Sequence, residues 1–214
     1  LHIHVCEQLR ELKECHGEHG LSPIELLAKH QVLGDHTTLI HATHLSKNDI
    51  EHIARTKSLV GACPTTEANL GDGFLPSTAL LEHNVRISLG TDSHAQIDLF
   101  QEARNVDMQQ RLLLKQRNPL ARFGQTSSLK QRTSDVLWPM MTTNGYQSLG
   151  IHGGTLTPGA LADFIVVDLS HPACLGSKPE DLLDTLILAG QPDAIKAVFV
   201  NGKAVLQDRV SPAE

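Results

Sequence analysis

The sequence has 214 residues, of which 40% are hydrophobic and 20% are charged, a composition typical of a folded globular protein and not of a disordered chain. Its net charge is −6, and acidic and basic residues are mixed along the chain. No basic stripe could neutralise phosphates, and no apolar run approaches the ~18 residues of a spanning helix, so we expect neither nucleic acid nor a membrane as a partner.

From Leu1 to Thr91 the sequence repeats one pattern: a short apolar run, a polar turn, and a stretch with helical periodicity. This alternation predicts parallel strands linked by helices. The predicted strands are Leu1–Cys6, Thr38–Ala42, Ser58–Cys63 and Val85–Gly90, and the predicted helices are Glu7–His19, Pro23–Gln31, Lys47–Thr56 and Pro76–His83. Four such units would form half of an eight-stranded barrel, since four open parallel strands leave two unpaired edges.

The second half of the sequence follows another pattern. We expect helices over Asp98 to about Asn118 and over Arg132–Leu149, with a loop between them at Gly124–Lys130. Two β-rich runs follow, Gly153–Asp168 and Ala194–Arg209, separated by a helix near Pro179–Ala189. The Asn201-Gly202 pair predicts a hairpin turn, because a type I′ turn needs positive φ at both central residues. Residues 1–150 are therefore interpreted as half of a barrel, and residues 151–214 as part of a small β domain.

The four cysteines, Cys6, Cys15, Cys63 and Cys174, form no CxxC pair, so we expect free thiols without a zinc knuckle or a redox motif. The first residues, Leu1 to Val5, lack the basic region and long apolar core of a signal peptide. We therefore expect a cytoplasmic protein.

Polar residues that close each strand are the candidates for chemistry, because catalytic groups of parallel barrels lie at the carboxyl ends of the strands. These residues are His4 and Glu7, then His41 and His44, then the loop Pro64–Glu67, then Asp92. His4 and Asp92 have the side chains that a catalytic zinc uses, Glu7 could act as general base towards its bound water, and His41 could contact the same water. Each residue taken singly is more often an ordinary loop residue, whereas the joint pattern favours a site.

At these residues the sequence resembles the amidohydrolase superfamily, and within it the mononuclear deaminase branch. The matching motifs are His4-Val5-Cys6-Glu7, His41 within Leu39–His44, and Asp92 within Gly90–His94. The resemblance implies an α/β fold that is the C-terminal half of a (β/α)8 TIM-type barrel (strands 5–8), together with part of a small β-sandwich domain. It also implies Glu7, His41 and Asp92 as catalytic residues, and zinc held by His4, Asp92 and a His-x-His pair on the first barrel strand.

That first-strand pair is absent from this sequence. His2 and His4 have the right spacing, but they precede the His-x-x-Glu motif directly and so belong to the fifth strand. Strands one to four of the barrel are also missing. We therefore expect the N-terminal half-barrel to be a partner of this chain, and a homodimer stays open.

The run Cys63–Gly73, with Thr91–His94, resembles most closely the superfamily members that convert N-formimidoyl-L-glutamate to N-formyl-L-glutamate and ammonia in histidine degradation. This resemblance implies a small-molecule substrate contacted by His41, Thr65, Glu67 and Asn69. One alternative is a deaminase for an aminated heterocycle of the guanine or triazine type. The other is a non-catalytic, truncated half-barrel, because two protein ligands make a poor zinc site.

Overall fold

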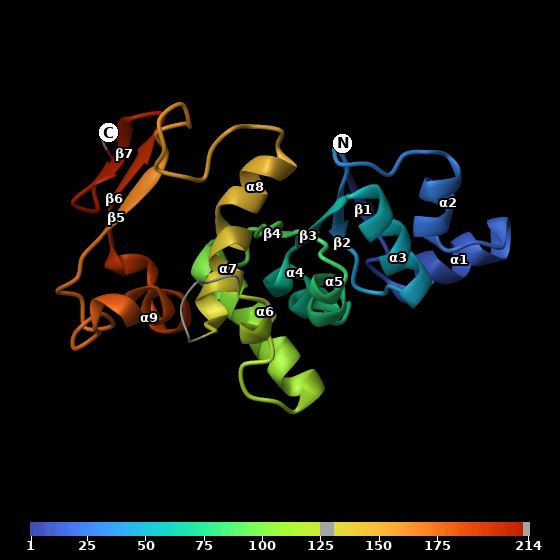
Figure 1. Cartoon of the computed structure of the whole chain (residues 1–214), viewed down its shortest axis with the longest axis horizontal. Helices are drawn as coiled ribbons and strands as arrows, with labels where there is room; N and C mark the ends of the chain where they lie inside the picture. The colour runs from blue at the N-terminus through green and yellow to red at the C-terminus, as the bar shows by residue number, and fades with distance from the viewer. Residues whose placement is uncertain (125–130, 212–214) are drawn as a thin grey trace.

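The computed structural model describes residues 1–124 and 131–211, and the first part forms a four-stranded parallel sheet. Its strands are β1 (His2–Val5), β2 (Thr38–His41), β3 (Leu59–Ala62) and β4 (Ile87–Leu89), in the spatial order β1-β2-β3-β4 (Figure 1). The predicted strands are confirmed, each being one or two residues shorter at its ends. Because neighbours in sequence are parallel neighbours in space, all four carboxyl ends lie along one edge.

The helices between these strands cover the sheet. They are α1 (Leu9–His19), α2 (Pro23–Lys29), α3 (Lys47–Thr56) and α5 (Ser77–Glu82), close to the predicted ranges. Ile24, Ile53 and Leu80 are fully buried from these helices in the same core as Leu39 and Val60 of the strands. Capping boxes start two of the helices: Ser22 with Glu25 at α2, and Ser46 with Asp49 at α3.

Two elements differ from the sequence-based expectation. A helix, α4 (Pro64–Leu70), occupies the segment after β3, where we expected a loop, and its first four residues are buried. The single helix expected over Arg132–Leu149 is two helices, α7 (Thr133–Met141) and α8 (Thr143–Ser148). They are separated by Thr142, whose φ of −126° and ψ of −97° are not helical. Pro139 lies in the last turn of α7 and cannot donate a backbone hydrogen bond there, which favours this break.

Helix α8 lies across the amino-terminal ends of the strands. Asn144 Nδ2 donates to the Ile87 carbonyl of β4 at 2.8 Å, and Ser148 Oγ lies 2.9 Å from Thr38 Oγ1 of β2. The ring of His2 is 2.9 Å from the Ser148 carbonyl. His2 is thus bound to α8, at the edge of the sheet opposite the strand ends that carry the candidate site.

The last part of the chain forms a three-stranded antiparallel sheet of β5 (Phe164–Val167), β6 (Ile195–Val200) and β7 (Lys203–Gln207). The predicted hairpin is confirmed, with φ of 49° at Asn201 and 74° at Gly202. Only this one sheet is present in the described C-terminal part, so the predicted sandwich stays a prediction. The remaining elements are α6 (Leu99–Leu114), α9 (Leu182–Ala189) and the 3-10 turns η1 (Ala121–Phe123), η2 (Pro179–Asp181) and η3 (Pro192–Ala194).

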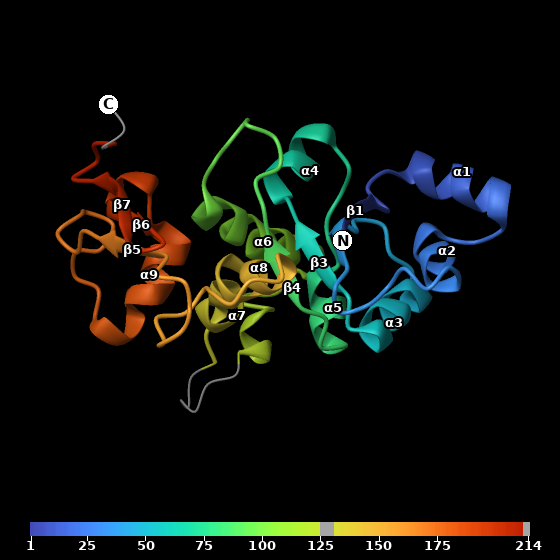
Figure 2. The same ribbon diagram turned by 90° about the horizontal axis from the view of Figure 1, so that it is seen from above.

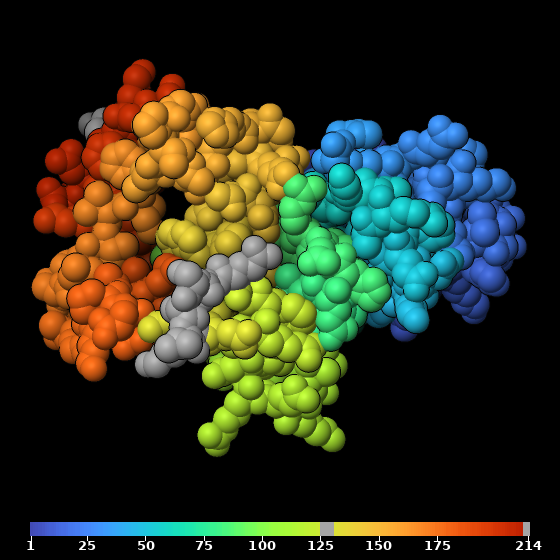
Figure 3. All heavy atoms as spheres, viewed as in Figure 1, coloured from blue at the N-terminus to red at the C-terminus, as the bar shows by residue number. Residues whose placement is uncertain are grey.

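Helix α9, which lies between β5 and β6 in the chain, links the three-stranded sheet to the helices α6 and α7. It packs on α6 and α7 through the buried Leu186 and Ile187. Arg104 of α6 donates to the carbonyls of Ile187 and Gly190 at 3.3 and 2.6 Å. The molecule is elongated, with α1 and α2 at one end and the β5–β7 sheet at the other (Figures 1 and 2), and the C-terminal end of α6 projects from its surface (Figure 3).

The loop predicted at Gly124–Lys130 lies, except for Gly124, outside the described residues. Within residues 1–124 and 131–211, every helix is too short or too polar to cross a bilayer.

Candidate active site

Three of the predicted site residues meet at the carboxyl ends of β1 and β2. The register pairs Val5 with His41, so His4, Glu7 and His41 share one corner of the sheet. His41 Nε2 lies 3.7 Å from Glu7 Oε1, and the rings of His4 and His41 have their centroids 5.3 Å apart. A histidine and a carboxylate this close can pass a proton between them through one water or a substrate atom.

The backbone is strained at these strand ends. Positive φ values occur at Cys6 (54°), His41 (69°), Ala42 (49°) and Asp92 (53°), none of which is glycine. A left-handed conformation costs such a residue about 1–2 kcal/mol, and residues of this kind gather at functional sites. The carboxylate of Glu11 secures the turn after β1 by accepting from the Cys6 and Glu7 amides at 2.9 and 3.0 Å.

His41 has a carboxylate on each side of its ring. Glu67 Oε1 lies 3.4 Å from Nδ1, on the side away from Glu7, and also accepts from the Cys63 amide at 2.8 Å. His41 and Glu67 are 1% and 0% exposed. The sequence analysis placed Glu67 in a loop after β3. It therefore did not predict that Glu67 is buried in the first turn of helix α4.

Burial and neighbouring charges shift the acid–base behaviour of the site. Burial raises the pKa of Glu7, and the adjacent Asp72 raises it further, while His41 and His4 oppose this shift. Burial alone would lower the pKa of His41, but Glu67, Glu7 and Asp92 together outweigh it and the pKa is raised. The sequence analysis did not identify Asp72. The Asp72-Gly73 pair after α4 predicts a turn, but it does not indicate that Asp72 contacts Glu7.

The other predicted residues lie around this corner in different ways. Asp92 is exposed on the turn after β4, and its charge acts on both His41 and the Cys63 thiol. Thr66 fixes that turn, since its hydroxyl donates to the Thr91 carbonyl at 3.0 Å and accepts from the Ser93 amide at 3.1 Å. Thr66 was not singled out from the sequence.

Thr65 and Asn69 do not point the same way. Thr65 is buried, and its amide and hydroxyl both donate to the carboxylate of Glu102 on α6, the amide at 2.9 Å. Asn69 is exposed in the last turn of α4. The hydroxyl of Thr65 is therefore occupied inside the protein, whereas Asn69 is free to meet solvent or a ligand.

His4 and Asp92 are the two zinc ligands that the sequence analysis predicts in this chain. His4 and Asp92 are of the donor types that zinc uses, but residues 1–124 and 131–211 contain no group of three or more His, Cys, Asp or Glu side chains arranged to hold a metal ion. A catalytic zinc normally has three protein ligands. The described chain therefore does not complete such a site by itself, and we assign no step to a metal.

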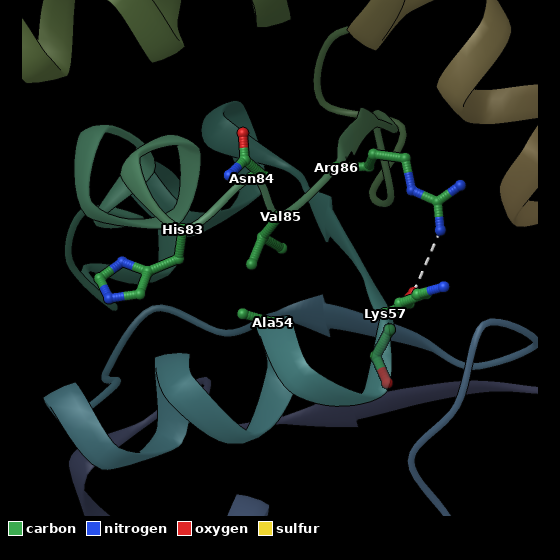
Figure 4. A pocket seen from close by; sticks show the side chains of 7 residues that line it. Ala54, Lys57, His83, Asn84, Val85 and Arg86 are labelled. Atoms are coloured by element: carbon green, nitrogen blue, oxygen red, sulfur yellow. Dashed lines mark hydrogen bonds between the residues drawn. The ribbon is translucent and has the colours of Figure 1, made fainter.

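A cavity of about 370 Å³ lies elsewhere, at the amino-terminal ends of β3 and β4 (Figure 4). It is lined by Ala54, Lys57, Ser58, His83, Asn84, Val85 and Arg86. Helices α3 and α5 both end there, and Arg86 donates to the Lys57 carbonyl at 3.1 Å. Arg86 thus lies at the C-terminus of α3, where a cation is favourable, and the cavity is separate from the candidate site.

Comparison with known proteins places these features among the amidohydrolases. The chain matches the Amidohydrolase family over residues 1–205. It is 33% identical over 208 residues to formimidoylglutamate deiminase of Pseudomonas aeruginosa, covering 97% of this chain and 45% of that protein. It is 31% identical over 175 residues to 5'-deoxyadenosine deaminase of Methanothermobacter thermautotrophicus, covering 80% and 38%.

A solved structure is similar in fold. It is an adenosine deaminase of Xanthomonas campestris with bound zinc, with a TM-score of 0.86 and 24% identity, over 100% of this chain and 46% of that one. The chain thus spans less than half the length of each of these proteins.

Proposed function

The chain belongs to the amidohydrolase family, and we propose that the full-length protein hydrolyses a carbon–nitrogen bond and releases ammonia. The observation that carries this proposal is the meeting of Glu7 and His41 at the carboxyl edge of the sheet, 3.7 Å apart. Among the described residues it brings a general base and a hydrogen-bonding imidazole to the edge where parallel-sheet enzymes hold their substrates.

Glu7 takes the role of proton carrier in this proposal. Its carboxylate removes a proton from the attacking water and later delivers it to the leaving nitrogen. The raised pKa of Glu7 suits both steps, because a carboxyl group that holds its proton more firmly is a stronger base and still returns the proton to an amine. His41 Nε2 then accepts a hydrogen bond from the water or from the hydroxyl group of the tetrahedral intermediate.

We propose zinc as the cofactor, with His4 and Asp92 as two of its ligands and the remaining ligands outside this chain. When bound, such a zinc lowers the pKa of its water to about 7. The zinc-bound adenosine deaminase of similar fold supports this part of the proposal.

For the substrate we propose N-formimidoyl-L-glutamate, which would yield N-formyl-L-glutamate. The relative at 33% identity supports this choice. The charge of the site fits the reacting end of this substrate: Glu7, Glu67 and Asp92 all act on His41, and acidic surroundings favour the amidine group, which is cationic at neutral pH. The alternative is an aminated heterocycle, favoured by the relative that deaminates 5'-deoxyadenosine.

Ammonia release by the full-length protein tests this proposal. N-formimidoyl-L-glutamate, 5'-deoxyadenosine, guanine and a triazine would be compared, together with zinc content. We expect turnover of the first substrate, and loss of both zinc and turnover in Asp92→Asn. Glu51→Gln, an exposed change on α3, should leave both unaltered. Full activity in Asp92→Asn would contradict the site, whereas turnover of only 5'-deoxyadenosine would contradict the substrate.

A further inference from the structure

The carboxylate of Glu67 contacts the His41 ring on its Nδ1 side, and Glu7 lies on the Nε2 side. Glu67 Oε1 is 3.4 Å from Nδ1 of His41, while Nε2 of the same ring is 3.7 Å from Glu7. Glu67 is 0% exposed, and its Oε1 lies beside His41 Nδ1 and accepts from the Cys63 amide. Substrate binding by Glu67 is a prediction from the sequence, whereas these contacts join it to His41.

We propose instead that Glu67 is a positioning residue, which accepts the Nδ1 proton of His41 and so keeps Nε2 directed towards Glu7. A neutral imidazole carries its proton on one nitrogen, and the hydrogen bond at the other end of the ring decides which one. With the proton fixed on Nδ1, Nε2 offers its lone pair to the reacting water. The catalytic use of this arrangement rests on the proposed function; the position of the proton does not.

Glu67 is itself held in place. The same Oε1 accepts from the Cys63 amide at 2.8 Å, and Cys63 is the residue from which the buried first turn of α4 starts. The carboxylate therefore cannot swing away without releasing the start of the helix. This anchoring gives the His41 ring a fixed reference inside the protein.

The buried carboxylate of Glu67 also lowers the stability of the fold. Glu67 Oε2 is buried and has no hydrogen-bond partner. A buried acceptor left unpaired lowers stability by about 1–3 kcal/mol, more when it is charged. A methionine or leucine would fill the same space without an unpaired acceptor, but it would leave the Cys63 amide unpaired. The carboxylate is therefore accounted for by its two contacts, with that amide and with His41, and not by its volume.

Nitrogen-15 NMR of the His41 ring tests the proposal directly. In the full-length protein without substrate, neutral His41 should carry its proton on Nδ1. Glu67→Gln keeps an acceptor at Oε1 and should retain this form. Glu67→Met fills the volume but cannot accept the proton, and should shift the ring to the Nε2-protonated form. Glu102→Gln is the matched control: this carboxylate is equally buried and also accepts from an α4 amide, but it has no contact with His41.

Kinetics give the second measurement. We expect Glu67→Met to lower kcat by about 10–100-fold with a much smaller change in KM, and Glu67→Gln to recover most of the loss. A neutral wild-type ring that carries its proton on Nε2 would overturn the proposal without any variant, as would a Glu67→Met protein with unchanged kcat and raised KM. If no substrate of the panel is turned over but the NMR result holds, the proposed function fails and the positioning role stands.

Discussion

Glu7 is the residue on which the proposed chemistry depends most. Its pKa is raised by burial and by Asp72. It faces Nε2 of His41, while Glu67 contacts Nδ1 of the same ring. Replacing Glu7 by Gln keeps the shape and removes the proton carrier, so we expect kcat for ammonia release to fall by about 10²–10⁴-fold. Zinc content should be unchanged, because Glu7 is not a proposed ligand. A Glu7→Gln protein with wild-type turnover would exclude it as the base.

Glu102 is a second carboxylate with a raised pKa, but its effect should appear in stability. Burial raises its pKa, and the two hydrogen bonds from Thr65 only partly oppose this. The folded protein therefore keeps this proton to a higher pH than the unfolded chain. Stability should then fall as pH rises from the ordinary glutamate pKa through the raised folded value, since the folded state binds more protons in that window.

The measurement is urea unfolding of the chain at a series of pH values across that window. Glu102→Gln should flatten the decline of the unfolding free energy with pH. Some slope should remain, because burial also raises the pKa of Asp107. The exposed change Glu51→Gln should leave the slope as it is. An unchanged slope in Glu102→Gln would show that its pKa is not raised in the folded protein.

At the scale of elements, variants of two glycines allow the effect of backbone strain on stability to be measured apart from that of steric contact. Gly17 lies in helix α1 and Gly202 in the β6–β7 turn, and a Cβ would meet nothing within 4 Å at the first and only Ala162 Cβ at 3.8 Å at the second. They differ in backbone: Gly202 has a φ of 74°. We expect Gly17→Ala to stabilise by about 0.4–1 kcal/mol and Gly202→Ala to destabilise by about 1–2 kcal/mol. Urea unfolding of both variants checks the signs, and equal effects would contradict the argument.

The strands and the helices between them were predictable because their patterns are local. Short apolar runs mark β1–β4, and Ser22 and Ser46 mark two helix starts. Helix α4 was not predictable in this way, since its polar first turn, Pro64–Glu67, is buried by contacts with distant segments such as Glu102 of α6. The break between α7 and α8 was likewise hidden, although Pro139 was a local sign of it.

The same division applies to the candidate site. His4 and His41 lie at the carboxyl ends of their strands, and Glu7 and Asp92 lie just after theirs, so a parallel sheet alone brings them to one edge. Asp72 and the burial of Glu67 depend on how α4 and the loop after it fold over β2. Gly73 of that loop lies so close to Thr43 and His44 that a Cβ would sit 3.2 Å from Thr43 Cγ2. Such an approach is tertiary and leaves no periodic signal in the sequence.

At the scale of the whole molecule, the four-stranded parallel sheet has two edge strands, β1 and β4. Within the described chain β1 pairs only with β2, and β4 only with β3, although Asn144 takes up the Ile87 carbonyl of β4. Unpaired backbone groups at sheet edges promote pairing with other chains. The same described residues offer two proposed zinc ligands and no group of three.

We therefore expect this 214-residue chain, expressed alone, to self-associate and to retain well under one zinc per chain after dialysis. Light scattering across a range of concentrations and metal analysis measure the two properties, with the full-length protein carried through the same dialysis as the reference. The reference should keep its zinc, because the proposal places the remaining ligands outside this chain. A monomer of the 214-residue chain that holds one zinc tightly would mean that the chain builds a complete metal site by itself, and that His4 and Asp92 have partners which the sheet edge does not reveal.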